Sequence, residues 1–132
     1  MLFFSRKEEK MKKIINIDGK EYTIKSSAFT QFAYKDMTGR SLLKDLQSMI
    51  DVVSKENIEK DMSVLEQFIE PILDMTYIML NEADEKQVSS KDDFLKNIEC
   101  LYDDWKWIED VIFMAVNPLS RQLQKDINNI KQ

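Results

Sequence analysis

Glycine and proline are scarce in this chain, which holds two of each among its 132 residues. Average usage is roughly 7% for glycine and 5% for proline. A β-sandwich or a β-barrel needs many tight turns, and these residues dominate such turns. The scarcity therefore favours long helices, and the length suits one mostly α-helical domain with a single buried core. It also leaves few positions for a glycine-rich phosphate-binding loop.

Histidine is absent, and Cys100 is the one cysteine. Without histidine the chain has no Ser-His or Cys-His nucleophile pair, no imidazole metal ligand and no ordinary base that titrates near neutrality. A lone cysteine forms neither an internal disulfide nor a zinc cage. The composition therefore predicts a protein that is not an enzyme and that binds no metal and no cofactor.

The net charge of −5 is unevenly distributed, with +3 on residues 1–25 and −8 on the remainder. Nucleic-acid binding rests on many cationic phosphate contacts, so an acidic body argues against it. No apolar run approaches the roughly 18 residues of a membrane span. We therefore expect a cytoplasmic protein that binds neither nucleic acid nor a membrane. Residues 1–11 are expected to form a flexible leader, in which Met11 is a natural internal start.

The clearest β signal is a hairpin within residues 12–25, centred on Asp18 and Gly19. Asp-Gly tolerates the positive φ angles of a two-residue hairpin turn. Such a turn places Ile15 opposite Tyr22 and gives one face to Ile15, Ile17, Tyr22 and Ile24. Because a lone hairpin is marginal in water, we expect this face to pack on helices.

Apolar residues at helical spacing predict about five helices after the hairpin, so that residues 12–117 form a small helical bundle. Gly39 ends the first predicted helix, residues 28–38, which carries Phe29, Phe32, Ala33 and Met37 on one side. The most apolar stretch, residues 62–83, is expected to be a buried central helix that Pro71 kinks or divides. A later helix is capped by Ser90, and its apolar stripe continues through Trp105 to Ala115.

Two features are the predicted partner contacts. Residues 118–132 are expected to form an amphipathic tail helix with the stripe Leu119, Leu123, Ile127 and Ile130. This stripe either folds back onto the domain or faces a partner helix, and both alternatives stay open. Helical spacing puts Trp105 in the core and turns Trp107 away by roughly 200°, so Trp107 is expected to be an exposed interface anchor. Cys100 is expected to be a small buried apolar residue.

Two patterns have both a chemical and a structural interpretation. Ser41-Leu42-Leu43-Lys44 matches the Ser-x-x-Lys of penicillin-recognising enzymes, but the further motifs of those enzymes are missing, which favours a helix cap at Ser41. Residues 81–104 hold eight carboxylates and three lysines, without the ligand spacing of an EF-hand calcium loop. A solvated acidic surface, or a surface for a basic partner, is the favoured interpretation.

Four segments in order carry a resemblance to a known family. The segments are Ile17-Asp18-Gly19-Lys20-Glu21-Tyr22, Thr38-Gly39-Arg40-Ser41-Leu42-Leu43, Leu73-Asp74-Met75-Thr76-Tyr77-Ile78-Met79, and Ser89-Ser90-Lys91-Asp92-Asp93-Phe94-Leu95. With their spacing over residues 12–117, this order resembles the tail assembly chaperones of long-tailed phages and prophages of Gram-positive bacteria.

In that family a small helical protein keeps tail proteins soluble and helps the tail tube and tape-measure proteins assemble. It is absent from the finished virion, and many members also exist as a longer, frameshifted product. The resemblance therefore implies a non-catalytic chaperone that binds unassembled tail tube or tape-measure protein, with self-association left open. The alternative is a small prophage or host regulator that acts through protein contacts.

Overall fold

The described part of the chain begins with a β-hairpin. This computed structural model describes residues 12–53, 63–102 and 104–131, with the backbone alone at 53, 64, 65 and 127–131. Strand β1 (Lys12–Ile17) pairs antiparallel with β2 (Lys20–Lys25), and Ile15 lies opposite Tyr22 as predicted. The turn residues Asp18 and Gly19 have φ angles of 54° and 84°. The predicted inner face is confirmed, because its four side chains are at most 9% exposed.

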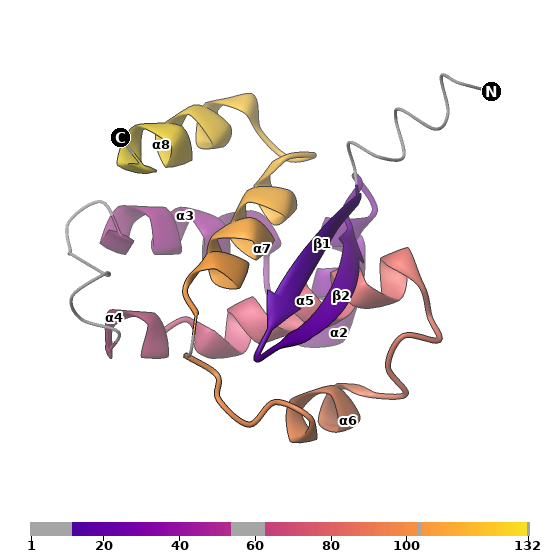
Figure 1. The fold of residues 1–132 in the computed structure, drawn as a ribbon. Helices are drawn as coiled ribbons and strands as arrows, with labels where there is room; N and C mark the ends of the chain where they lie inside the picture. Colours follow the sequence, from indigo (N-terminus) through magenta and orange to yellow (C-terminus); the bar gives the residue numbers. More distant parts are fainter. Residues whose placement is uncertain (1–11, 54–62, 103, 132) are drawn as a thin grey trace, which may run out of the picture.

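Helices follow the hairpin and form most of the domain (Figure 1). The prediction of a mostly helical single domain with an N-terminal hairpin is therefore confirmed. Over the described ranges the helices are α2 (Thr30–Thr38), α3 (Leu42–Val53), α4 (Ser63–Glu66), α5 (Ile69–Ala83), α6 (Lys91–Lys96), α7 (Lys106–Val116) and α8 (Arg121–Lys131).

Helix α5 lies at the centre of the fold, where it contacts β2, α2 and α7 (Figure 1). Its side chains from Ile72 to Leu80 are buried, except for the partly exposed Tyr77, which confirms the prediction of a buried central helix. Pro71 lies in the first turn, where a proline is tolerated because that amide has no helical partner. The predicted division occurs just before this turn, since α4 ends at Glu66 and α5 begins at Ile69. The predicted start of this stretch at residue 62 lies outside the described residues.

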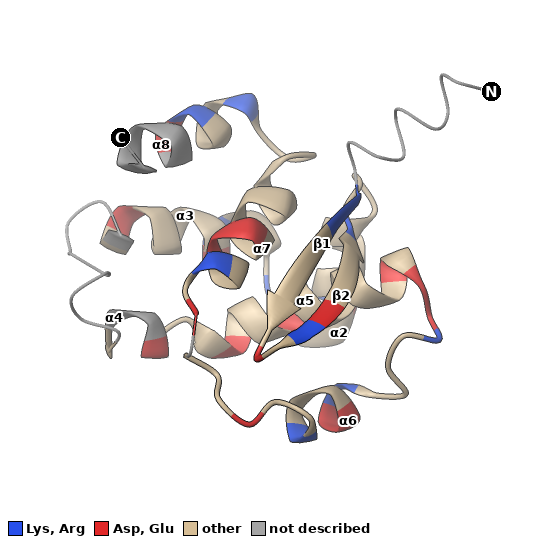
Figure 2. Ribbon diagram, in the orientation of Figure 1, with Lys and Arg blue, Asp and Glu red and all other residues tan. Residues whose placement is uncertain are grey.

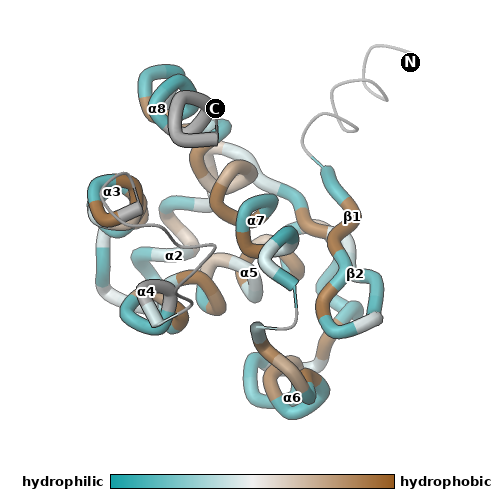
Figure 3. Tube along the Cα trace, turned by 60° about the vertical axis from the view of Figure 1, so that its left-hand side comes forward, coloured by the Kyte–Doolittle hydropathy of each residue, from teal (hydrophilic) through white to brown (hydrophobic). Residues whose placement is uncertain are grey.

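Helix α7 packs between the hairpin and the remaining helices, in contact with β1, α5, α3 and α8. In Figure 3, α7 runs through the middle of the molecule and is mostly hydrophobic, whereas α8 lies outside it and is mostly hydrophilic. Helix α8 begins just beyond Pro118 and Ser120, and the Ser120 hydroxyl accepts the Leu123 amide at 3.2 Å. The helix contacts α3 and α7, so the described part of the tail folds back onto the domain.

The segment between α6 and α7 differs from the prediction. The Ser90 cap is confirmed, since its hydroxyl accepts the Asp93 amide at 3.0 Å, but α6 ends at Lys96 instead of continuing through Trp105. The carboxylate of Asp18 in the hairpin turn accepts the amides of Glu99 at 2.8 Å and Cys100 at 3.2 Å. These bonds join the non-helical segment after α6 to the hairpin turn. The prediction of a buried Cys100 is wrong, because it assumed helical spacing here and the side chain is exposed.

Candidate functional site

Helix α2 presents an apolar face to solvent. The side chains of Phe29, Phe32 and Met37 are 64%, 65% and 41% exposed, and we call these three residues the α2 apolar face. Phe29 and Met37 lie in one row with Ala33 at four-residue spacing, and Phe32 lies beside this row. However, the buried side chains of this helix are Thr30 and Tyr34. Among the described residues, the other large apolar side chains with comparable exposure are Ile14 and Leu43.

The orientation of α2 follows from the polar groups of its buried side. The hydroxyl of Tyr34 donates to the carboxylate of Asp45 in α3, and it accepts a 3.2 Å bond from the guanidinium of Arg40. Burial, reinforced by the bond to Asp45, raises the pKa of the Tyr34 hydroxyl above its ordinary value. Because these groups are satisfied, the aromatic ring is buried at no polar cost. Phe29 and Phe32 are left on the opposite side of the helix.

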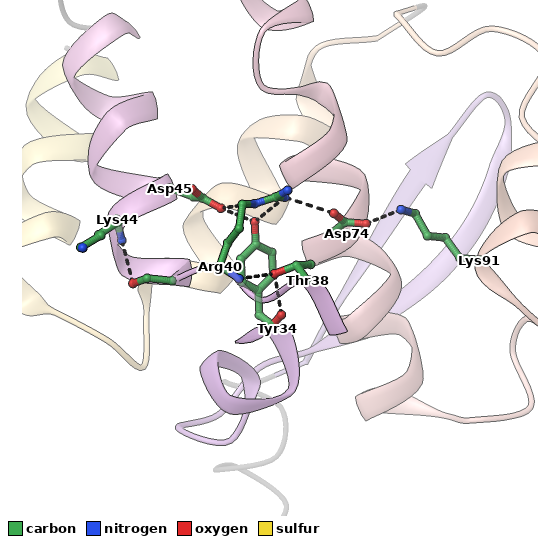
Figure 4. Close-up of polar contacts among 8 residues, drawn as sticks. Tyr34, Thr38, Arg40, Lys44, Asp45, Asp74 and Lys91 are labelled. Atoms are coloured by element: carbon green, nitrogen blue, oxygen red, sulfur yellow. Dashed lines mark hydrogen bonds and ion pairs between the residues drawn. The ribbon is translucent and has the colours of Figure 1, made fainter. Parts of the chain in front are cut away.

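Arg40 and Asp74 connect this cluster to the centre of the domain (Figure 4). The Arg40 guanidinium lies 3.1 Å from Asp45 Oδ2 and 3.3 Å from Asp74 Oδ2, and Asp74 also pairs with the ammonium of Lys91. Asp74 is buried on α5, whereas Lys91 opens α6. One buried carboxylate therefore ties the α2–α3 turn and the start of α6 to the central helix.

The Thr38–Leu43 segment that carries the family resemblance builds this turn. Gly39 adopts a left-handed conformation with φ 76°, and its amide donates to the Lys35 carbonyl to close α2. The Thr38 hydroxyl accepts the Arg40 amide at 3.0 Å, which directs Arg40 back toward Tyr34. Ser41 accepts the Lys44 amide at 3.3 Å, as the cap interpretation predicts. The motif thus positions α2 relative to α3 and α5.

A hollow of about 540 Å³ opens beside the α2 apolar face. We call it the α2–α5 hollow, because its walls are α2, the last turns of α5 and the loop that follows α5. Its lining combines apolar side chains with two carboxylates. It consists of Phe29, Ala33, Met37, Tyr77, Ile78, Asn81, Glu82, Glu85, Val88 and Ser89. The volume lies within the range of about 300–1,000 Å³ typical of ligand sites.

Glu82 is one of two carboxylates that line the hollow. Its Oε1 accepts a 2.6 Å bond from the Thr30 hydroxyl, while its Oε2 is buried without a hydrogen-bond partner in the described structure. Glu85 is the second carboxylate of the lining, which contains no lysine or arginine. Figure 2 shows the acidic residues at the end of α5 and the start of the following loop. The lining of the hollow therefore combines apolar side chains with negative charge.

Gln87 fixes the loop that closes the hollow. Its side-chain carbonyl accepts the Thr23 amide at 2.6 Å, and its amide nitrogen donates to the carbonyls of Thr23 at 2.9 Å and Leu80 at 3.1 Å. These bonds join the loop to the edge of β2 and to α5. The three hydrogen bonds of Gln87 thereby position Val88 and Ser89, which line the hollow.

The prediction that Trp107 is exposed is wrong, because the side chain is 1% exposed. The prediction continued one helical stripe through residues 94–115 and measured the angular position of Trp107 from Trp105. Helix α7 instead begins at Lys106, and within it Trp107, Val111 and Met114 share the buried side. Trp105, expected in the core, is only partly buried against it. Trp107 is thus a core residue in this conformation.

The structure describes two of the four side chains of the tail stripe. Leu123 is 7% exposed within the hydrophobic core, and Leu119 packs against that core. The side chains of Ile127 and Ile130 lie outside the described residues. The described half of the stripe therefore contacts its own domain.

Other kinds of site find little support in the described ranges. These ranges contain no group of three or more histidine, cysteine, aspartate or glutamate residues that could hold a metal ion. None of their helices has the length and apolar character needed to cross a membrane. Comparison with known proteins gives no match for the chain, whether against protein-family models, curated proteins or solved structures. The geometry of the α2–α5 region is therefore the main evidence on function.

Proposed function

We propose that this chain is a non-catalytic tail assembly chaperone of a phage or prophage. It binds unassembled tail tube or tape-measure protein in the bacterial cytoplasm and is released before the virion is complete. The observation that carries the proposal is the α2 apolar face, where Phe29 and Phe32 are each about two-thirds exposed beside an open hollow. The choice of tail proteins as clients rests on the family resemblance of residues 12–117.

An exposed apolar face suits a chaperone that holds its client reversibly. Large apolar side chains grouped on a surface mark protein contact sites, because their exposure to water is unfavourable. The core is filled without Phe29, Phe32 and Met37, so these residues are free to contact a client without unfolding the domain. By mass action, a chaperone on the assembly surface of the client lowers the free client concentration until the growing tail displaces it.

The contact surface in this proposal is the α2 apolar face with the α2–α5 hollow, in place of Trp107 and Leu123, which are buried. The net charge of −5 adds long-range attraction for basic segments of a client. That attraction acts mainly on the association rate and weakens as the salt concentration rises.

The proposal is tested by co-expression with the tail tube protein encoded in the same gene cluster. The measurement is the soluble fraction of the tube protein with the wild-type chain, with a Phe29→Ser/Phe32→Ser double variant, and with Ile14→Ser as the matched control. Ile14 is 63% exposed on the hairpin, so its replacement removes similar apolar surface elsewhere.

We expect the wild type and Ile14→Ser to raise the soluble fraction and the double variant to lose this effect. A tube protein and a tape-measure protein that are equally soluble with and without the chain would contradict the proposal. We also expect the gene of this chain to lie between a tube-protein gene and a long tape-measure gene.

A further inference from the structure

We propose, resting on the chaperone function above, that the α2–α5 hollow recognises one kind of client segment. This segment is an amphipathic helix that carries a lysine or arginine about one turn from a large apolar side chain. The apolar side chain enters the hollow between α2 and α5, and the cation pairs with Glu82. The structure thereby assigns Glu82 as the residue that selects basic segments.

The first argument is the unsatisfied carboxylate of Glu82. The Thr30 hydroxyl holds Oε1 at 2.6 Å, so the side chain is fixed in one orientation. Its Oε2 is buried and has no hydrogen-bond partner in the described part of the chain. A buried acceptor without a donor is unfavourable, and an ammonium or guanidinium group supplies strong charge-assisted donors. A partner whose cation displaces the atoms that cover Oε2 would supply this missing donor.

The second argument is the direction of α5. Glu82 lies in the last turn of this helix, where the backbone carbonyls carry partial negative charge. Natural helices often place a lysine or arginine there, but the last turn of α5 has no basic residue. Glu85 also lines the hollow. The end of α5 and the two carboxylates together favour a cation in the hollow. The lining of the hollow contains no lysine or arginine of the described part of the chain.

The third argument is the shape of the apolar part. Ala33 lies between Phe29 and Met37 on the same side of α2, and its small side chain leaves room between the larger ones. Tyr77 and Ile78 of α5 form the opposite wall. A leucine, phenylalanine or methionine of a partner can therefore insert beside Ala33, while Phe32 contacts the flank of the same partner.

The fourth argument concerns the partner's backbone. Extended peptides bind by adding a strand to a free sheet edge, which supplies main-chain hydrogen bonds. The residues of the hollow belong to helices, to the turn before α2 and to the loop after α5, and none lies on a strand. Recognition here consequently depends on side chains, as when an amphipathic helix lies in a helical groove.

The experiment selects 16-residue peptides from a random display library on the immobilised full chain. Synthetic versions of the selected peptides are then measured by calorimetry against the wild type, Glu82→Gln and Phe29→Ala. The matched controls are Glu21→Gln, an exposed glutamate on β2, and Ile14→Ala on β1. Glutamine keeps the shape of Glu82 and an acceptor for Thr30, so this variant is expected to fold normally.

We expect selected peptides to share a lysine or arginine three or four positions from a large apolar residue. Glu82→Gln and Phe29→Ala should each weaken binding about tenfold, while the controls leave it unchanged. Replacing the basic residue of the peptide should weaken its binding to the wild type by the same factor. Its binding to Glu82→Gln should hardly change. This loss of coupling is the signature of a direct contact.

Three results would overturn the inference. One is selected peptides without a basic residue, or binding that Glu82→Gln leaves intact. Another is that a peptide of residues 1–11, which places Phe3 and Phe4 ahead of Arg6, binds more tightly than every selected peptide; the chain's own leader would then be the occupant. The third is a dimer that Phe29→Ala dissociates, which would assign the hollow to a second copy of the chain.

The two proposals fail separately. If selected peptides bind with the expected dependence on Glu82 while tail proteins do not bind, the ligand chemistry is right and the chaperone function is wrong. If tail proteins bind the Glu82→Gln and Phe29→Ala variants as tightly as they bind the wild type, the chaperone function stands and the assignment of the hollow is wrong.

Discussion

The hydroxyl of Thr30 donates a 2.6 Å hydrogen bond to Oε1 of Glu82, across 52 positions of the sequence. Thr30 is 1% exposed at the start of α2, and Glu82 lies in the last turn of α5. The same hydroxyl accepts the Ser27 amide at 2.9 Å, which orders the turn before α2. This one side chain therefore fixes both walls of the α2–α5 hollow.

Replacing Thr30 with valine should lower the free energy of unfolding by about 1–3 kcal/mol. The shape is kept, but both Glu82 Oε1 and the Ser27 amide lose a buried partner. Urea denaturation measures the change, and Thr30→Ser, which retains the hydroxyl, should recover most of it. Equal stability of the valine and serine variants would contradict the role given to this bond.

Replacing Asp74 with asparagine should lower the free energy of unfolding by about 1–3 kcal/mol, less than for a fully buried ion pair. Asp74 is buried, but its partners Arg40 and Lys91 are partly exposed and regain water when the pair is lost. The control is Asp92→Asn on the exposed side of α6, expected within about 0.5 kcal/mol of the wild type. A similarly small effect at Asp74 would argue against the clamp between α5, α6 and the α2–α3 turn.

Replacing Gly39 with alanine should cost about 1 kcal/mol, because a side chain disfavours its φ angle of 76°. A Cβ atom at this position would meet no atom within 4 Å, so backbone strain is the whole effect. Gly39→Asn should cost less, since asparagine tolerates the left-handed region. The two variants are compared by thermal unfolding, and a larger loss for asparagine than for alanine would show that the strain argument fails.

Stability should fall as the pH rises above about 10, the ordinary pKa of tyrosine. Burial and the bond to Asp45 raise the pKa of Tyr34 in the folded state, and burial also raises the pKa values of Tyr22 and Tyr102. Below that pH both states keep the proton and the stability is unaffected. Above it the unfolded chain ionises first, which favours unfolding.

Tyr34→Phe isolates the contribution of this residue to the alkaline loss. The variant is expected to be less stable at neutral pH, because Asp45 and Arg40 lose a partner, but its melting temperature should fall less steeply between about pH 9 and about pH 11. The two slopes are compared by thermal unfolding. Parallel slopes would mean that Tyr34 titrates in the folded state as it does in the unfolded chain.

Local patterns in the sequence were enough to predict the hairpin and the caps at Ser41 and Ser90. They did not predict the start of α2, which was expected after a cap at Ser26-Ser27 and lies instead at Thr30, without a side-chain cap. The Asp18-Gly19 turn sets the pairing of Ile15 with Tyr22, and Ser90 caps the turn that directly follows it. Such features depend on residues within a few positions of one another. For that reason a single sequence contains nearly all the information needed.

The position of Trp107 depended on a boundary that periodicity does not reveal. Apolar residues continue through residues 94–115, yet α6 ends at Lys96 and α7 begins at Lys106. Between them, Asp18 accepts the amides of Glu99 and Cys100 from more than 80 positions away. Within α7, Trp107 lies four positions before Val111 and shares its buried side, whereas the prediction measured the angle of Trp107 from Trp105, which precedes the helix. Local periodicity does not reveal contacts, such as those of Asp18, between residues that are distant in the sequence.

The candidate site was missed for a related reason. Apolar periodicity grouped Phe29 and Phe32 on one side of the helix without showing that this side faces solvent. The buried residues of α2 are Thr30 and Tyr34, whose polar groups have partners on α3 and α5. The hollow is also assembled from three separate segments, α2 with the turn before it, α5 and the loop after α5. Thr30 and Tyr34 alternate with Phe29 and Phe32 in the sequence, but this pattern alone does not show which pair is buried. The partners on α5 and α3 decide it.

The most direct test of the account is the affinity of the full chain for purified, unassembled tail tube protein. The dissociation constant is measured for the wild type, for Phe29→Ser/Phe32→Ser and for Ile14→Ser as the control. The account predicts equal affinity for the wild type and the control, and binding at least about tenfold weaker for the double variant. Undiminished binding by the double variant, or no binding by the wild type to either tail tube or tape-measure protein, would contradict it.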